Sequence, residues 1–245
     1  MSLRKLYAVA LLSTMTLLFA PPVLAQADAR AQAAAEIESL RAQIKAKESA
    51  LLSPSKEDRR AHADFLLQPG TGLVRLLPRE KWDGKLSTRG GGAYYSFTRR
   101  THEYGHGSDI SLEQNALSVG FAGANFGFMA DIGDVPIELV SGETEGVRYM
   151  ASFQTPSPEP DARKAQRQFG GGGLQTGQWT YKDRMPVNVG STYVLRSVNY
   201  ESSDVLVAFR VVRKDSDGSV VLLWKMLQEF PKPTLARNLA PADGQ

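Results

Sequence analysis

The segment that most constrains the fold is the apolar run at residues 204–229, DVLVAFRVVRKDSDGSVVLLWKMLQE. Asp217-Gly218 is a favoured dipeptide for a tight hairpin turn, and the flanking runs are rich in β-branched residues. One face of the predicted hairpin carries Val207, Phe209, Val211, Leu222, Trp224 and Met226. The other carries Leu206, Ala208, Val212, Val221 and Leu223, interrupted by Arg210 and Lys225. Because both faces are largely apolar, we expect the hairpin at the centre of a domain, covered on each side by sheet or helix.

The chain before this hairpin has the same character from residue 71 onward. Short β-favouring runs alternate with Gly, Pro, Asn and Asp, at a spacing typical of antiparallel sheets. The predicted strands are 72–77, 93–100, 116–121, 125–130, 135–140, 147–154, 178–182, 191–199, 204–213 and 219–229. One helix is predicted near 159–168. The sequence therefore predicts a mainly β fold: an antiparallel β-sandwich or barrel-like all-β domain over residues 71–230, with a flexible tail over 231–245.

Helical sequence precedes this domain. Residues 26–52 lack Gly and Pro and are rich in Ala, Glu, Lys, Arg and Leu, which favour helix. Ile37, Leu40, Ile44 and Leu51 follow the spacing of a coiled-coil seam that Lys47 interrupts, so the segment 27–52 is expected to self-associate or to dock on the domain. In the connector 53–70, Ser55 and Asp58 form a capping-box pattern for a short second helix.

The first 25 residues have the pattern of a secretory signal peptide. Arg4 and Lys5 precede an apolar segment over 6–20, and small residues at 23–25 predict cleavage before Gln26. The apolar segment is short for a membrane span, and nothing after it is long and apolar enough to cross a bilayer as a helix. We therefore expect an exported protein, periplasmic or secreted, without a transmembrane span after cleavage.

Charge and cysteine content exclude several functions. The chain has 29 Lys and Arg against 26 Asp and Glu, and two of the basic residues lie in the predicted signal peptide. The mature chain is then close to neutral, which gives no support for a nucleic-acid partner. There is no cysteine, and this excludes disulfides, cysteine catalysis and thiolate metal sites.

The sequence HEYGH at residues 102–106 matches the H-E-x-x-H pattern of zinc hydrolases. In that chemistry His102 and His106 would bind zinc from one helical face, and Glu103 would take a proton from the metal-bound water. A strand-like sequence precedes the motif, and Gly105 and Gly107 disfavour a helix. Residues 99–112 are therefore expected to be a strand end and turn. We assign no catalytic, cofactor or metal residue, and keep Glu103 with His102 and His106 as the zinc alternative.

Other patterns are weaker. Asp215-Ser216-Asp217-Gly218 resembles the start of a calcium loop but lacks the rest of that loop, and the hairpin turn accounts for it.

The leading hypothesis is an exported, non-enzymatic β-domain protein with a binding or structural role in the cell envelope or outside the cell. Its partner would be a protein or a glycan. The alternatives are a zinc-dependent hydrolase acting through HEYGH and a carbohydrate-binding module, which would present aromatic side chains in a row on one sheet face.

Overall fold

The computed structural model describes residues 22–102, 104–105 and 107–236, and the chain divides into two units, Met1–Lys47 and Glu48–Gln245. Most of the predicted signal peptide therefore lies outside the described residues. Helix α1 (Pro22–Leu52) includes the whole predicted helical segment and begins four residues before the predicted cleavage position. Within the described residues, no helix is long and apolar enough to span a membrane.

The connector after α1 forms two short helices rather than one. In α2 (Lys56–Ala61), the Ser55 hydroxyl accepts a hydrogen bond from the Asp58 amide, and the Asp58 carboxylate accepts one from the Ser55 amide. This confirms the predicted capping box. The helix is interrupted at His62, and α3 (Ala63–Leu66) follows and packs Phe65 into the domain core.

The centre of the second unit is a five-stranded antiparallel sheet, here called sheet A, in the order β1-β11-β10-β9-β5. Its strands are β1 (Thr71–Leu76), β5 (Phe126–Asp131), β9 (Thr192–Asn199), β10 (Ser203–Lys214) and β11 (Val220–Glu229). The predicted hairpin is β10–β11, with Val207 opposite Met226, Phe209 opposite Trp224 and Val211 opposite Leu222. Both faces of this hairpin are buried, as the sequence predicts.

A second antiparallel sheet, sheet B, covers the face of sheet A that carries Phe209 and Trp224. Its order is β2-β3-β4-β8, with β2 (Tyr94–Tyr95), β3 (Ile110–Glu113), β4 (Ala116–Ser118) and β8 (Arg184–Pro186). Side chains of both sheets meet in one apolar cluster, including Tyr95, Leu112 and Leu117 from sheet B. The two sheets are not closed on one another, so of the two predicted architectures the fold is the sandwich.

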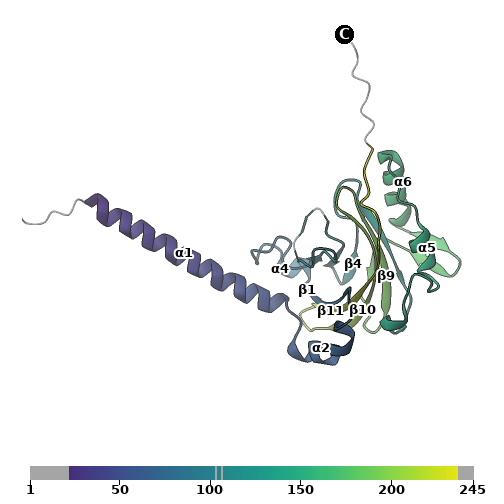
Figure 1. Cartoon of the computed structure of the whole chain (residues 1–245), viewed down its shortest axis with the longest axis horizontal. Helices are drawn as coiled ribbons and strands as arrows, with labels where there is room; N and C mark the ends of the chain where they lie inside the picture. Colours follow the sequence, from purple (N-terminus) through teal and green to yellow (C-terminus); the bar gives the residue numbers. More distant parts are fainter. Residues whose placement is uncertain (1–21, 103, 106, 237–245) are drawn as a thin grey trace, which may run out of the picture. The chain divides into compact units, whose positions relative to one another are not determined.

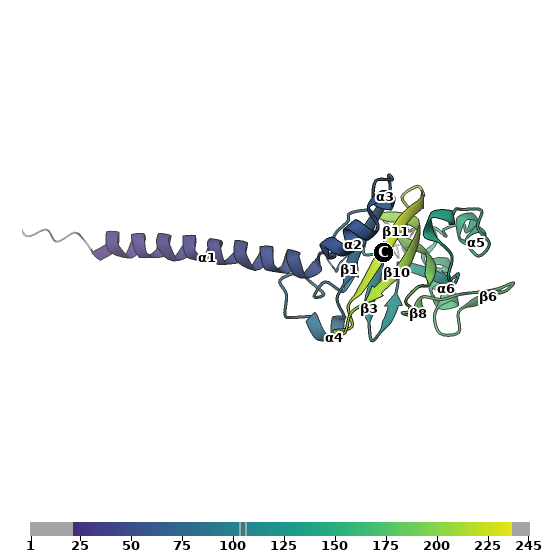
Figure 2. The same ribbon diagram turned by 90° about the horizontal axis from the view of Figure 1, so that it is seen from below.

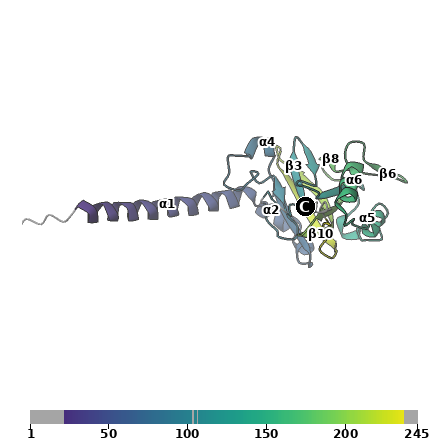
Figure 3. The ribbon, with the colours of Figure 1, turned by 90° about the horizontal axis from the view of Figure 1, so that it is seen from above.

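The opposite face of sheet A is covered largely by helices, and α6 among them confirms the helix predicted near 159–168. The domain is mainly β, as predicted, with this helical layer on one side. Helices α5 (Arg148–Ser152) and α6 (Glu159–Phe169) lie on this side (Figure 1), where Phe128 and Leu206 meet Met150 and Phe169. The 3-10 turn η1 (Ile137–Leu139) packs Ile137 into the same cluster. Helix α4 (Arg79–Trp82) lies between β1 and β2 in the sequence. The hairpin of β6 (Leu174–Thr176) and β7 (Trp179–Tyr181) projects beside α6 (Figures 2 and 3).

The predicted strands at 135–140 and 147–154 are wrong for one physical reason. Ile137 with Val140, and Val147 with Met150, are buried at a spacing of three residues, which places each pair on one side of a helical turn. Strand β2 is much shorter than the predicted strand at 93–100, because the chain turns after Ser96.

The prediction of a flexible tail from residue 231 is also wrong over the part that is described. The Glu201 amide donates to the Pro233 carbonyl, and Ala236 exchanges backbone hydrogen bonds with Ser157 and Glu159. Pro233 is buried. These contacts hold residues 231–236 against the domain, and residues 237–245 lie outside the described residues.

Candidate functional site

The HEYGH segment is a turn and loop wherever it is described. Thr101 makes an isolated bridge with Ser96, residues 102, 104, 105 and 107 are not helical, and strand β3 begins at Ile110. His102 packs edge-on against Tyr95, with ring centroids 5.1 Å apart, and its Nε2 lies 2.8 Å from the Arg75 carbonyl oxygen. Nε2 therefore carries the proton. Burial lowers the pKa of His102, and the bond to that carbonyl acts in the opposite direction.

Glu103 and His106 lie outside the described residues, so the structure places only one of the three proposed zinc-site side chains. In the described part of the chain, no three His, Asp or Glu side chains gather closely enough to hold a metal ion. No specific observation favours the hydrolase alternative.

Asp109, just beyond the motif, is the most perturbed acidic group. Its carboxylate accepts from the Phe97 amide at 2.8 Å, the Ser197 hydroxyl at 2.8 Å and the Asn199 amide at 3.0 Å. Burial raises the pKa of Asp109 to about 6, although these bonds act to lower it. The side chain has no exposed surface. Because both oxygens are bonded within the protein, Asp109 joins the turn after β2 to strand β9 and cannot reach a substrate.

The outer face of sheet B carries a polar groove of about 380 Å³, which is the candidate binding site. Its floor is one row of paired residues across the four strands: Tyr94 opposite Ser111, Ser111 opposite Ser118, and Ser118 opposite Arg184. The inner-facing neighbours of this row, such as Leu112 and Leu117, belong to the sandwich core. Strand alternation therefore directs the row outward.

One hydroxyl on this floor has no partner. The Ser118 Oγ is shielded from solvent and, within the described residues, makes no hydrogen bond. A shielded polar atom that is left unbonded costs free energy, and bound water or a ligand removes that cost. The groove therefore offers a polar contact at its floor.

Charged and aromatic side chains form the walls of the groove. Arg79 contacts Glu113 at 3.5 Å, and Arg184 donates to the Glu113 carbonyl and to the Gln114 side chain. The other wall residues are Tyr104, Phe121 and Asp183. Burial raises the pKa of Asp183. The groove thus combines two guanidinium groups, two carboxylates and hydroxyl groups with little net charge.

Three aromatic rings lie at one end of the groove. Tyr94 is buried, with Tyr104 at a centroid distance of 4.7 Å and Phe121 at 5.2 Å, and both of these are half-buried. The Arg89 guanidinium stacks over the Tyr104 ring at 4.7 Å. Phe121, Arg79 and Arg184 could not be assigned to a site from the sequence, because it is the sheet pairing that brings them to one face.

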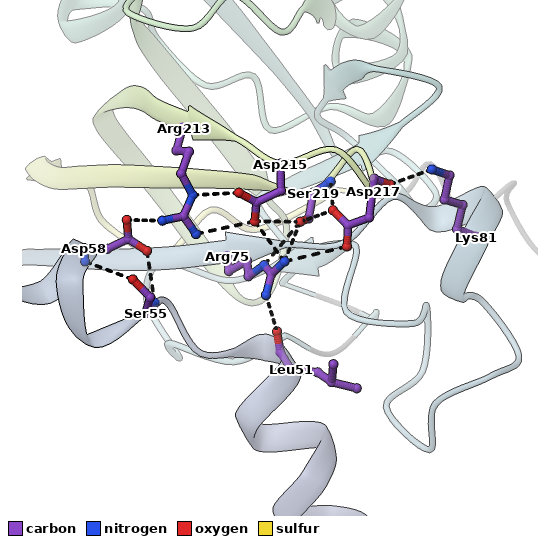
Figure 4. A network of polar contacts seen from close by, with 9 residues as sticks. All are labelled: Leu51, Ser55, Asp58, Arg75, Lys81, Arg213, Asp215, Asp217 and Ser219. Carbon is purple, nitrogen blue, oxygen red and sulfur yellow. Dashed lines mark hydrogen bonds and ion pairs between the residues drawn. The ribbon is translucent and has the colours of Figure 1, made fainter.

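At the β10–β11 turn, whose sequence resembles the start of a calcium loop, arginine side chains contact the carboxylates (Figure 4). Arg75 donates to Asp215 at 2.9 Å and lies 3.6 Å from Asp217, and Arg213 contacts both Asp215 and Asp58. Arg75 also lies 3.5 Å from the Leu51 carbonyl oxygen. These guanidinium groups supply the positive charge for the three carboxylates. The network joins the ends of α1 and α2 to the β10–β11 turn.

Comparison with known proteins gives no further guide. No protein-family model, curated protein or solved structure matches this chain.

Proposed function

We propose that this chain is an exported, non-enzymatic binding protein whose β domain takes a polar ligand in the groove of sheet B. The observation that carries the proposal is the outward row Tyr94–Ser111–Ser118–Arg184, with a shielded and unbonded Ser118 hydroxyl on its floor. Ligand sites are concave and combine apolar walls with a few convergent polar groups. The groove has this form.

Among polar ligands, a glycan is favoured by the groove's composition. Sugar hydroxyls both donate and accept hydrogen bonds, and the groove offers guanidinium donors, carboxylate acceptors and serine hydroxyls that do both. The half-buried rings of Tyr104 and Phe121 can receive the apolar face of a sugar. The exposed row of aromatic residues expected of a carbohydrate-binding module is not present on this face in the described residues, so the contact would be to one or two sugar rings.

The groove can be tested by filling it. Ser118→Tyr places a large side chain on the floor, and Gln175→Tyr places the same side chain on the exposed strand β6 as a matched control. The unmodified protein and both variants would be titrated with soluble oligosaccharides, including peptidoglycan fragments, and binding followed by calorimetry. Binding that Ser118→Tyr abolishes and Gln175→Tyr retains supports the proposal. Binding that survives Ser118→Tyr places the ligand elsewhere.

We propose further that α1 pairs with a second copy of the chain, which would present two binding domains together. Ile37, Leu40 and Ile44 are about half exposed, at 49, 50 and 51%. Ile at the first and Leu at the fourth position of a heptad favour two parallel strands. In that arrangement Glu36 faces Arg41 of the second copy, which is an attractive pair.

The binding role is proposed together with export to the cell envelope or the extracellular space. The basic start, apolar segment and small residues before Gln26 carry the export proposal. Amino-terminal sequencing of the protein recovered from the periplasm or the culture medium should begin at Gln26. A chain that begins at Met1 and stays in the cytoplasmic fraction would contradict it.

A further inference from the structure

A second cavity, separate from the groove, lies where the end of α1 and helix α2 meet strands β1 and β2. It has a volume of about 240 Å³. Its polar lining consists of Ser49, Ser53, Arg59, Tyr95, Arg100 and His102. The lining includes two arginines and a histidine and no Asp or Glu. This composition differs from that of the groove, in which acidic and basic groups balance.

The two arginines of this cavity have no anionic partner. Within the described residues, neither the Arg59 nor the Arg100 guanidinium makes a hydrogen bond or an ion pair. By contrast, Arg75, Arg79 and Arg213 each contact a carboxylate. Because the lining supplies no counter-charge for either guanidinium, a bound anion would gain charge-assisted contacts there.

Contacts at its backbone and at its guanidinium hold Arg100 in place. Its backbone is left-handed, with φ of 56°, a conformation that is unfavourable for a residue with a side chain. Its amide donates to the Ser96 carbonyl at 2.7 Å, and its guanidinium lies 5.3 Å from the centre of the Trp224 ring. The turn therefore fixes the start of the side chain, and the buried indole supports its charged end.

The neighbouring groups suit an anion. Tyr95 keeps its proton at neutral pH, because burial raises its pKa to about 12, and its hydroxyl can donate. His102 is held by its Nε2–H bond to the Arg75 carbonyl. An anion in the cavity would stabilise the protonated form of this ring.

We infer that this cavity binds a phosphate group, either as the free ion or at the end of a small phosphomonoester. Guanidinium groups recognise the oxygens of phosphate through paired charge-assisted hydrogen bonds, and Arg59 and Arg100 can supply them. The cavity is larger than a phosphate ion requires, so a small organic group can accompany it. This inference does not depend on the groove of sheet B.

The test measures phosphate binding to the full mature chain by calorimetry, at constant ionic strength set with sodium chloride. The variants are Arg59→Gln, Arg100→Gln and their combination, with Arg60→Gln on the same helix as the matched control. Each of the two cavity variants should weaken binding by roughly tenfold or more, and Arg60→Gln should leave it unchanged. Glycerol 3-phosphate would be compared with inorganic phosphate to distinguish the two sources, and sodium acetate would show whether a carboxylate suffices.

The nuclear magnetic resonance signal of the His102 ring gives a readout that does not depend on affinity. Phosphate should raise the pKa of His102 in the unmodified protein and in Arg60→Gln, and should fail to do so when both cavity arginines are replaced. The absence of saturable binding at millimolar phosphate would overturn the inference. So would binding that the double variant retains. Tighter binding of acetate than of either phosphate compound would overturn the choice of ligand.

Discussion

At the scale of single residues, Trp224 is the largest fully buried side chain of the domain. It lies 5.3 Å from Phe97 and 6.4 Å from Tyr95 between ring centroids, and it faces Gly72 across β1 and β11. We predict that Trp224→Ala lowers the free energy of unfolding by about 3–5 kcal/mol, because it leaves a cavity between the two sheets. Urea denaturation measures the change.

Two further substitutions make this test specific. Leu67→Ala, at a residue that is 85% exposed, should change the free energy of unfolding very little. Gly72→Ala should destabilise the domain, because its added Cβ would lie 2.5 Å from the indole ring. Equal effects of Trp224→Ala and Leu67→Ala would show that the hairpin faces are assigned wrongly.

Asp109 should make stability depend on pH. Its pKa rises from 3.8 to about 6 on folding, so between about pH 4 and 6 the folded state holds a proton that the unfolded state has lost. Stability from this group is therefore present below pH 4 and decreases as the pH rises, by on the order of 3 kcal/mol. Asp109→Asn is destabilising because an amide cannot accept from all the donors around it, and it removes this dependence. The loss in free energy of unfolding that Asp109→Asn causes should therefore become smaller as the pH rises from 4 to 7.

Urea denaturation at several pH values measures this difference. The exposed Asp64→Asn variant is the control, and its cost should be the same at each pH. A cost of Asp109→Asn that grows toward pH 7 would mean that the folded protein prefers the ionised carboxylate.

The sequence predicts the orientation and contacts of a single residue only where they follow from a local pattern. The faces of Phe209 and Trp224 follow from strand alternation, and the structure confirms them. Two of the partners of Asp109, Ser197 and Asn199, are 88 and 90 residues away in the chain. No local spacing indicates such a contact, and the cross-strand row of sheet B is hidden for the same reason.

At the scale of secondary structure elements, the regular strands and helix α6 were predictable, whereas η1 and α5 were not. Strands β9, β10 and β11 have long apolar runs, and each lies within two residues of its predicted bounds. Segments 137–140 and 147–150 contain β-favouring residues, but they are too short to show a helical period clearly. Their buried residues pack against sheet A, so their conformation depends on contacts with parts of the chain that are distant in the sequence.

The network around Arg75 is an element-scale device, because it joins β1, α2 and the β10–β11 turn. We predict that Arg75→Met lowers the free energy of unfolding by roughly 1–3 kcal/mol, since Asp215 and Asp217 lose a shared cation. Arg148→Met, which removes an exposed pair with Glu143, is the control and should have a smaller effect. Thermal melting compares the two. Equal losses would mean that the network does not hold these elements together.

The network around Arg75 should also make the free energy of unfolding depend on pH, in a more acidic range than Asp109 does. Burial acts to raise the pKa of Asp217, but hydrogen bonds from Ser219 and the charge of Arg75 lower it overall. The pKa of Asp58 is lowered too, against burial, by hydrogen bonds to Ser55 and by Arg213. Stability from these groups is present above about pH 4 and is lost as the pH falls through their folded values. Arg75→Met should make the acid part of the stability profile less steep.

At the scale of the whole molecule, the exposed apolar stripe of α1 predicts that the chain acts in pairs. Arg41 lies 2.9 Å from Glu38 within its own helix, and both side chains are about 70% exposed, at 70 and 72%. Such an exposed pair contributes little, so Arg41 is free to face Glu36 of a second copy. We predict that the mature protein is a dimer by light scattering, and that Leu40→Ser with Ile44→Ser makes it a monomer.

Charge reversal tests the parallel register of this pair. Glu36→Lys puts like charges opposite each other and should weaken the dimer by several-fold, because each helix pair loses two attractive contacts. Adding Arg41→Glu to that variant restores opposite charges and should restore the dimer, whereas Ala42→Lys, on the outer face of the helix, should have little effect. Sedimentation equilibrium measures each dissociation constant. In an antiparallel pair, Glu36 and Arg41 would not face each other. Failure of Arg41→Glu to rescue Glu36→Lys would therefore exclude the parallel arrangement. An unmodified protein that is monomeric would exclude pairing through α1 altogether.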